Sequence, residues 1–192
     1  MRATSGLDKR AVANLWAAAE FARHLNTPLN LWFVVAWETA NTAGLVQDAQ
    51  RHFAQNMRKW LERRGIPVRY LWVLERGSRH GIHANILVYV PPGDTSTLFR
   101  AKVRDWIRQC GGDILRGGTS KTVVFRPPYD DHGLQQYLTK GVQQDAAAWA
   151  KKKFDIDRVD QGTFMGRRSQ VSNSIGPAVR EAWYARQTDL AA

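Results

Sequence analysis

The fold is decided by residues 68–90, whose sequence is VRYLWVLERGSRHGIHANILVYV. Two runs rich in β-branched and aromatic residues, 68–76 and 82–90, predict two strands. The loop between them, residues 77–81, begins and ends with glycine and has the length of a hairpin connection. We therefore predict an antiparallel hairpin.

The flanking segments extend this hairpin into a larger α+β unit. Apolar runs and helical periodicity predict strands over residues 31–37 and 121–126 and helices over residues 8–24, 45–64, 95–110 and 131–144. From residue 31 onward this is the order of a ferredoxin-like βαββαβ sheet with two helices on one face. The other face is expected to be open for a ligand unless the extra helices cover it. We divide the chain into an N-terminal helix (1–28), a central domain (29–150) and a loosely packed basic C-terminal extension (151–192).

The charge balance indicates a polyanionic partner. Lysine and arginine number 28 against 17 acidic residues, a net charge of +11, and arginine supplies 20 of the 28. Arginine binds phosphate bidentately and stacks on bases, so nucleic acid is the expected partner. A generically basic protein is the alternative.

Other features exclude several classes of protein. The single cysteine, Cys110, excludes an internal disulfide and a cysteine zinc cluster, and indicates a reducing, cytoplasmic location. The apolar runs are far shorter than the roughly 20 residues of a membrane-spanning helix. Residues 1–10 are not followed by an apolar stretch, so we expect no signal peptide.

Polar residues in the hairpin predict a metal site. His83 and Asn85 share one face of their strand, and Glu75 is expected opposite His83 on the same face. A carboxylate, an imidazole and an amide oxygen suit Mg²⁺ or Mn²⁺. His80, in the loop, is expected to contact a substrate phosphate. The alternative is an exposed polar sheet face without a metal.

Two further groups of residues are candidates for chemistry and binding. Tyr137 and Lys140 lie three apart on a predicted helix, where the ammonium would favour a nucleophilic phenolate. Alternatively, Tyr137 belongs to a core stripe. Near the C-terminus, a set of cations is expected to contact the nucleic-acid backbone, or else to form an ordinary solvated surface: Lys151, Lys152, Lys153, Arg167 and Arg168.

Taken in order, these motifs resemble the HUH-type rolling-circle replication initiators of plasmids and phages. The resemblance spans roughly residues 31–176 and rests on three elements. These are Glu75 at the end of a strand, the His83-Ala84-Asn85 triplet, and the Tyr137-x-x-Lys140 motif. The triplet departs from the family's His-x-His, although asparagine keeps an oxygen acceptable to Mg²⁺ or Mn²⁺. No second tyrosine lies three or four residues from Tyr137, as in single-tyrosine members.

The resemblance implies a metal-dependent nickase that cuts and joins single-stranded or origin DNA. Tyr137 would be the nucleophile, Lys140 its helper, and Glu75, His83 and Asn85 the ligands of Mg²⁺ or Mn²⁺. Arg76, Arg79 and the arginine pair at 167–168 would line the DNA path. Because no P-loop is present, unwinding would fall to a host helicase.

Two other functions compete with nicking. The first is a DNA-binding replication protein that keeps the fold but has lost nicking through Asn85. The second is an RNA-binding sheet domain, although the aromatic pattern of such domains is missing here.

Overall fold

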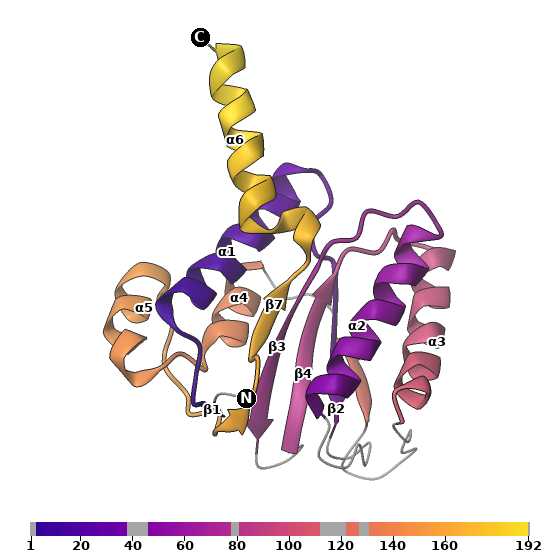
Figure 1. The fold of residues 1–192 in the computed structure, drawn as a ribbon, viewed down its shortest axis with the longest axis horizontal. Helices are drawn as coiled ribbons and strands as arrows, with labels where there is room; N and C mark the ends of the chain where they lie inside the picture. The colour runs from indigo at the N-terminus through magenta and orange to yellow at the C-terminus, as the bar shows by residue number, and fades with distance from the viewer. Residues whose placement is uncertain (1–2, 38–45, 78–80, 112–121, 127–130, 192) are drawn as a thin grey trace.

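The computed structural model describes residues 3–37, 46–77, 81–111, 122–126 and 131–191 (Figure 1). Its strands are β1 (Ala3–Thr4), β2 (Leu31–Ala36), β3 (Tyr70–Gly77), β4 (Gly81–Val88), β5 (Val123–Arg126), β6 (Phe164–Met165) and β7 (Ser169–Val171). Its α-helices are α1 (Lys9–His24), α2 (Val46–Glu62), α3 (Asp94–Gln109), α4 (Asp131–Thr139), α5 (Ala147–Phe154) and α6 (Pro177–Ala191). Two 3₁₀ turns, η1 (Gln144–Ala146) and η2 (Asn173–Ile175), complete the set.

The central sheet has the predicted α+β architecture. Its strand order is β5-β2-β4-β3-β7, and every neighbouring pair is antiparallel. The four strands from β2 to β5, with α2 and α3 between them, follow the predicted βαββαβ order. A separate two-stranded pair joins β1 to β6.

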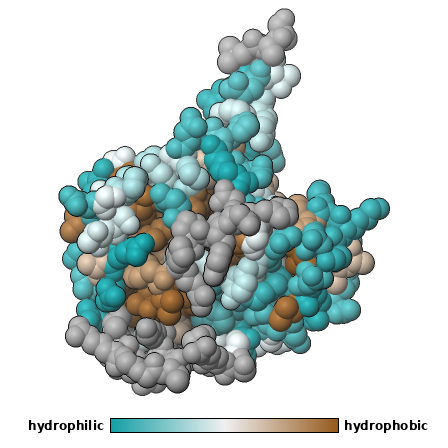
Figure 2. Space-filling view, turned by 180° about the vertical axis from the view of Figure 1, so that it is seen from behind, coloured by the Kyte–Doolittle hydropathy of each residue, from teal (hydrophilic) through white to brown (hydrophobic). Residues whose placement is uncertain are grey.

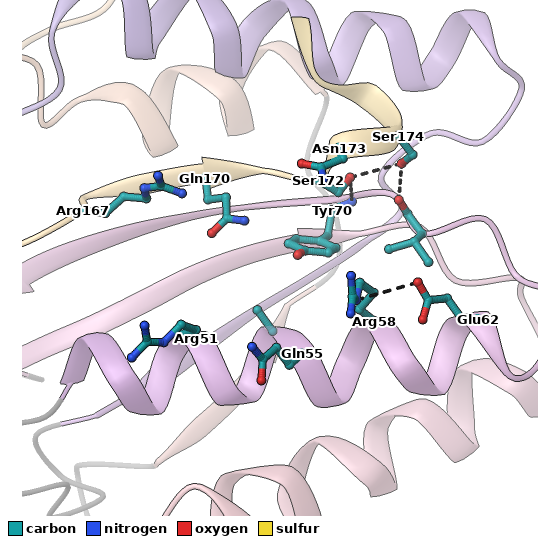
Figure 3. Close-up of a pocket in the computed structure, with 12 residues that line it drawn as sticks. Arg51, Gln55, Arg58, Glu62, Tyr70, Arg167, Gln170, Ser172, Asn173 and Ser174 are labelled. Atoms are coloured by element: carbon teal, nitrogen blue, oxygen red, sulfur yellow. Dashed lines mark hydrogen bonds and ion pairs between the residues drawn. The ribbon is translucent and has the colours of Figure 1, made fainter. Parts of the chain in front are cut away.

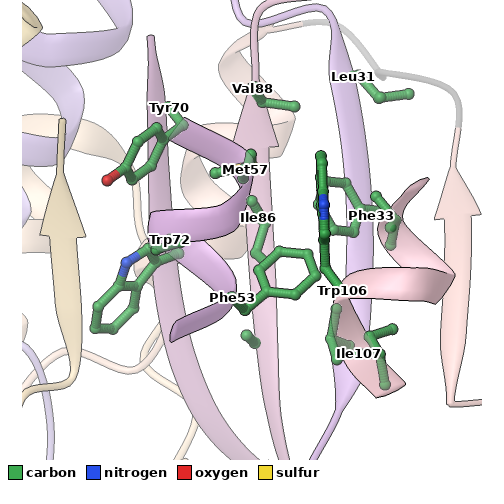
Figure 4. Close-up of a cluster of buried hydrophobic side chains, with 14 of the residues drawn as sticks. Leu31, Phe33, Phe53, Met57, Tyr70, Trp72, Ile86, Val88, Trp106 and Ile107 are labelled. Carbon is green, nitrogen blue, oxygen red and sulfur yellow. The ribbon is translucent and has the colours of Figure 1, made fainter. Parts of the chain in front are cut away.

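One face of the sheet packs against α2 and α3 (Figures 1 and 4). Alternate strand residues such as Phe33 and Ile86 point to this side, as the two-residue period of a strand requires. Phe53 of α2 contacts Phe33 of β2 and Trp106 of α3, with ring centroids 6.0 and 5.8 Å apart. This aromatic cluster joins both helices to the sheet.

The other face is not open, which corrects the expectation of an exposed ligand-binding sheet surface. Residues of α1, α4 and α5 pack there against Leu71 and Leu87 of the central strands. The physical reason is the apolar stripe of α1, which includes Leu15 and Phe21 and needs a surface to bury against. The sheet therefore lies between two layers of helices (Figure 1).

The expectation of a loosely packed C-terminal extension is also wrong for much of that segment. Residues Leu71, Trp72 and Val73 of β3 pair with β7, which adds a fifth strand to the sheet edge. Ile156 and Ile175 are buried in the second core. Beyond them, α6 stands away from the body of the molecule in both overall views (Figures 1 and 2). No helix in the described ranges is both long and apolar enough to cross a bilayer.

Arg168 joins the two ends of the chain. Its side chain is only 3% exposed, and its Nη2 donates to the backbone oxygens of Thr4 (3.0 Å) and Gly162 (2.5 Å). Burial lowers its pKa to about 10, against the opposing attraction of Glu75 and Asp160. The sequence suggested an exposed cation at this position, but the side chain holds the fold together.

We predict that Arg168→Ala destabilises the protein by about 3 kcal/mol, because two buried backbone oxygens lose a charged donor. The neighbouring Arg167 is exposed. Arg167→Ala is the matched control and should change the free energy of unfolding by less than about 0.5 kcal/mol. Urea unfolding of both variants measures the difference. Equal stability of the two variants would show that the Arg168 contacts do not stabilise the fold.

Candidate active site

The β3–β4 hairpin places three of the predicted site residues together. Glu75 lies directly opposite His83, and Asn85 lies opposite Val73, as the hairpin register predicts. Their side chains share the face covered by α1 and α4, and the exposed fractions of Glu75, His83 and Asn85 are 1%, 7% and 0%. The site is therefore enclosed beneath helices, whereas the sequence suggested an exposed sheet surface.

The carboxylate of Glu75 is the centre of this cluster. Its Oε2 accepts from Asn85 Nδ2 (3.1 Å) and lies 3.1 Å from Lys140 Nζ and 3.4 Å from His83 Nε2. Its other oxygen, Oε1, is buried and has no hydrogen-bond partner within the described part of the chain. One carboxylate oxygen is thus crowded with donors while the other is left to accept from a further group.

Trp32 of β2 determines which way Asn85 faces. The indole Nε1 donates to Asn85 Oδ1 over 3.3 Å. Because an indole nitrogen only donates, the amide oxygen must face Trp32 and the amide nitrogen must face Glu75. Sequence reasoning missed Trp32. The pairing of β2 with β4 places it on the same face as Asn85, but that register is not visible from the local sequence.

His83 has the orientation typical of a metal-binding histidine. Its Nδ1 lies 3.0 Å from the backbone oxygen of Gly81, which can only accept. Nδ1 therefore carries the proton and Nε2 faces Glu75. In metal sites the second ring nitrogen is commonly fixed in this way by a backbone carbonyl.

The last turn of α4 brings Tyr137 and Lys140 to the cluster. Lys140 Nζ lies 3.2 Å from the centre of the Tyr137 ring, which packs against Trp32 at 5.4 Å. Tyr137 is 41% exposed, whereas Leu134 and Leu138 are buried, so Tyr137 is not part of the core stripe. Lys140 thus lies between the tyrosine ring and the Glu75 carboxylate.

The predicted helix over 131–144 ends early, and this places Lys140. α4 stops at Thr139, because the backbone beyond it bonds to another segment. Gly141 O accepts from Leu7 N (2.8 Å), and Gln143 N donates to Leu7 O (2.9 Å). A Cβ at Gly141 would come within 2.8 Å of Gln161 Cγ, so only glycine fits this close approach without a shift of that side chain.

The site fits a divalent ion in part. Glu75 and His83 offer a carboxylate with an oxygen lacking a partner and a suitably directed imidazole nitrogen. Asn85 does not present its oxygen, and within the described ranges no three His, Cys, Asp or Glu side chains cluster as a metal site. The positive charge beside Glu75 is supplied by Lys140.

The predicted DNA-binding residues do not form one surface. Lys151, Lys152 and Lys153 are exposed on α5, where Lys151 pairs with Asp155 (2.6 Å) and Asp157 (3.0 Å). Arg167 is exposed beside β7, and Arg168 is buried. Arg76 is exposed near the end of β3, and its backbone N–H donates to Gln161 O (3.1 Å). Arg79 and His80 lie outside the described residues.

Comparison with known proteins identifies the family. A model of the replication-associated protein family that comprises ORF2 and the gene II protein matches residues 33–159, more than half of the chain. The matched segment contains Glu75, His83, Asn85, Tyr137 and Lys140. Searches of curated proteins and of solved structures found no match. The chain therefore belongs to the ORF2/gene II family of replication-associated proteins.

Proposed function

We propose that this protein nicks and rejoins single-stranded DNA to initiate rolling-circle replication of a plasmid or phage, in the manner of HUH-type initiators. The observation that carries the proposal is the contact between Tyr137 and Lys140 beside the buried Glu75–His83 pair. A half-exposed tyrosine next to a fixed ammonium has the properties of an activated nucleophile that a DNA strand can reach. Membership of a family of replication-associated proteins supports the same reaction.

In this mechanism the Tyr137 oxygen attacks a backbone phosphorus. A bond forms between the phenolic oxygen and phosphorus, and the bond from phosphorus to the 3′ oxygen breaks. The phenolic proton leaves, and the 3′ oxygen gains a proton. The products are a 5′-phosphotyrosine link and a free 3′-hydroxyl that can prime synthesis. Reversal of the same exchange rejoins a strand without ATP.

The surrounding side chains prepare the tyrosine for this step. The Lys140 ammonium, against the face of the ring, favours the phenolate and offsets negative charge that develops at phosphorus. Glu75 fixes Lys140 through their 3.1 Å ion pair, and Trp32 holds both Asn85 and the tyrosine ring. Tyr137 is thus held from two sides by residues of the sheet and of its own helix.

We further propose that Glu75 and His83 hold Mg²⁺ or Mn²⁺. Such an ion would supply Lewis-acid polarisation of the scissile phosphate. In the observed orientation Asn85 acts on Glu75 as a hydrogen-bond donor, so we assign it a positioning role. The same orientation favours the second candidate function, a DNA-binding replication protein of this fold without nicking activity, because one of the three expected ligands is not offered.

Tyr137→Phe is expected to abolish the denaturation-resistant protein–DNA adduct. Binding of single-stranded DNA should stay within about threefold of wild type, because one hydroxyl contributes little to ground-state binding. The assay incubates the protein with circular single-stranded DNA and Mn²⁺ and scores adducts after denaturation. Tyr184→Phe, at the half-exposed Tyr184 of α6, is the matched control and should form the adduct normally. An adduct in Tyr137→Phe would contradict the assignment, and no adduct in wild type would favour the DNA-binding function.

Lys140→Met should lower the rate of adduct formation by about 10²–10³-fold, because a preorganised cation is lost. It should also destabilise the fold by roughly 3 kcal/mol, since Glu75 is left as an uncompensated buried charge. Adding Glu75→Gln should restore most of the stability but not the rate. Urea unfolding and adduct kinetics measure the two effects. Lys151→Met removes a surface ion pair and should change neither measurement, whereas additive stability losses in the double variant would rule out the buried pair.

His83→Ala should weaken Mn²⁺ binding by at least about tenfold, through the loss of a ligand. Asn85→His should tighten it and extend binding toward Co²⁺ and Ni²⁺, because imidazole is a better ligand than an amide for these ions. Isothermal titration calorimetry gives the affinities without any need for activity. His52→Ala, at an exposed histidine of α2, is the control. Titrations identical to wild type in both site variants would refute the metal assignment.

A further inference from the structure

A second concave site lies on the opposite side of the sheet. A groove of about 570 Å³ runs between α2 and β7 (Figure 3). Arg51, Gln55 and Arg58 line it from α2, and Arg167, Gln170 and Asn173 line it from β7 and its flanks. This groove is built from the basic C-terminal stretch that the active site leaves unused.

The groove is separate from the tyrosine site. Gln170 pairs with Trp72, whose side chain belongs to the α2–α3 core, so the groove opens on that face of the sheet. Glu75 and His83 lie on the other face, under α1 and α4. Binding in the groove therefore does not depend on the nicking chemistry proposed for Tyr137.

The groove has a fixed shape at both ends. Gln47 Nε2 donates to Arg167 O (2.9 Å), which joins the beginning of α2 to the segment before β7. At the other end, Ser172 Oγ accepts from Tyr70 N (3.1 Å) and Ser174 Oγ donates to Val68 O. These contacts use the serine hydroxyls to hold the turn η2 in place. The lining side chains are thus presented on a preformed surface.

The lining is cationic and rich in amides that lack partners. It contains three arginines and one carboxylate, Glu62, which lies 3.7 Å from Arg58. Arg51 pairs with Asp48 on its own helix, whereas Arg167 has no ion-pair partner in the described part of the chain. The amide groups of Gln55, Gln170 and Asn173 likewise have no hydrogen-bond partner among the described residues, and Figure 3 shows Gln55 and Gln170 on facing walls.

We infer that this groove binds a segment of single-stranded nucleic acid through its phosphates. Arginine forks match phosphate oxygens, and carboxamides can pair with base edges. A groove of this volume takes a ligand of drug size. A short stretch of single strand fits that size, whereas a duplex is too wide to enter.

The test compares two variants that lose the same charge. Arg51→Gln/Arg58→Gln/Arg167→Gln removes the groove arginines. Lys59→Gln/Arg63→Gln/Arg104→Gln removes three exposed cations of α2, its end and α3 that do not line the groove. Fluorescence anisotropy with a labelled oligothymidine of about twelve nucleotides, within the range of known single-strand sites, gives affinity over a salt series.

The groove variant should bind about tenfold more weakly or worse, and its log–log salt slope should flatten by about 2, since each phosphate contact contributes about 0.7. The control variant should stay within about threefold of wild type. Equal losses in the two variants would overturn the inference, as would unchanged binding in the groove variant.

A single added charge provides a second test that leaves every arginine in place. Gln55→Glu puts a carboxylate in the groove, and Gln187→Glu puts one on exposed α6. Only Gln55→Glu should weaken binding, by several-fold. A matched duplex with the same dependence on the groove variants, or oligoglutamate that displaces the strand equally well, would refute a site for single-stranded nucleic acid.

Discussion

The buried carboxylate of Glu75 constrains everything around it. A charge with a 1% exposed side chain is costly unless it is paired and hydrogen-bonded. Here the compensation comes from three elements: Asn85 from the neighbouring strand, Lys140 from the end of α4, and the Trp32 indole that orients Asn85. Because each contact reaches the carboxylate from a different part of the fold, the site exists only when sheet and helices are assembled.

The position of Lys140 shows how the fold and the site depend on each other. α4 must stop at Thr139 for the next residue to turn toward Glu75. The stop is enforced by backbone hydrogen bonds between residues 141–143 and Leu7, near the N-terminus. The same region is bound to the C-terminal segment through Arg168 and Thr4. The two ends of the chain therefore stabilise the turn that delivers the lysine to the tyrosine.

Local sequence predicted what local physics controls. The glycine-bounded loop fixes the hairpin register, so Glu75 opposite His83 followed from the sequence alone. The i, i+3 spacing likewise predicted the contact of Tyr137 with Lys140. The burial of Arg168, the orientation of Asn85 and the groove at β7 did not follow, because each depends on pairing between segments far apart in the chain. The covering of the second sheet face by α1 was missed for the same reason.

Covering both faces of the sheet limits where a DNA strand can approach. In ferredoxin-like sheets with one bare face, a ligand can lie across the strands, but here the central strands are enclosed on both sides. Access is then confined to the rims, where Tyr137 is 41% exposed at the end of α4 and where α2 leaves β7 uncovered. These two places lie on opposite faces, and β7 is the edge strand. A single strand that used both would pass around this edge, so the C-terminal strand that completes the sheet also defines the path along which nucleic acid can be held.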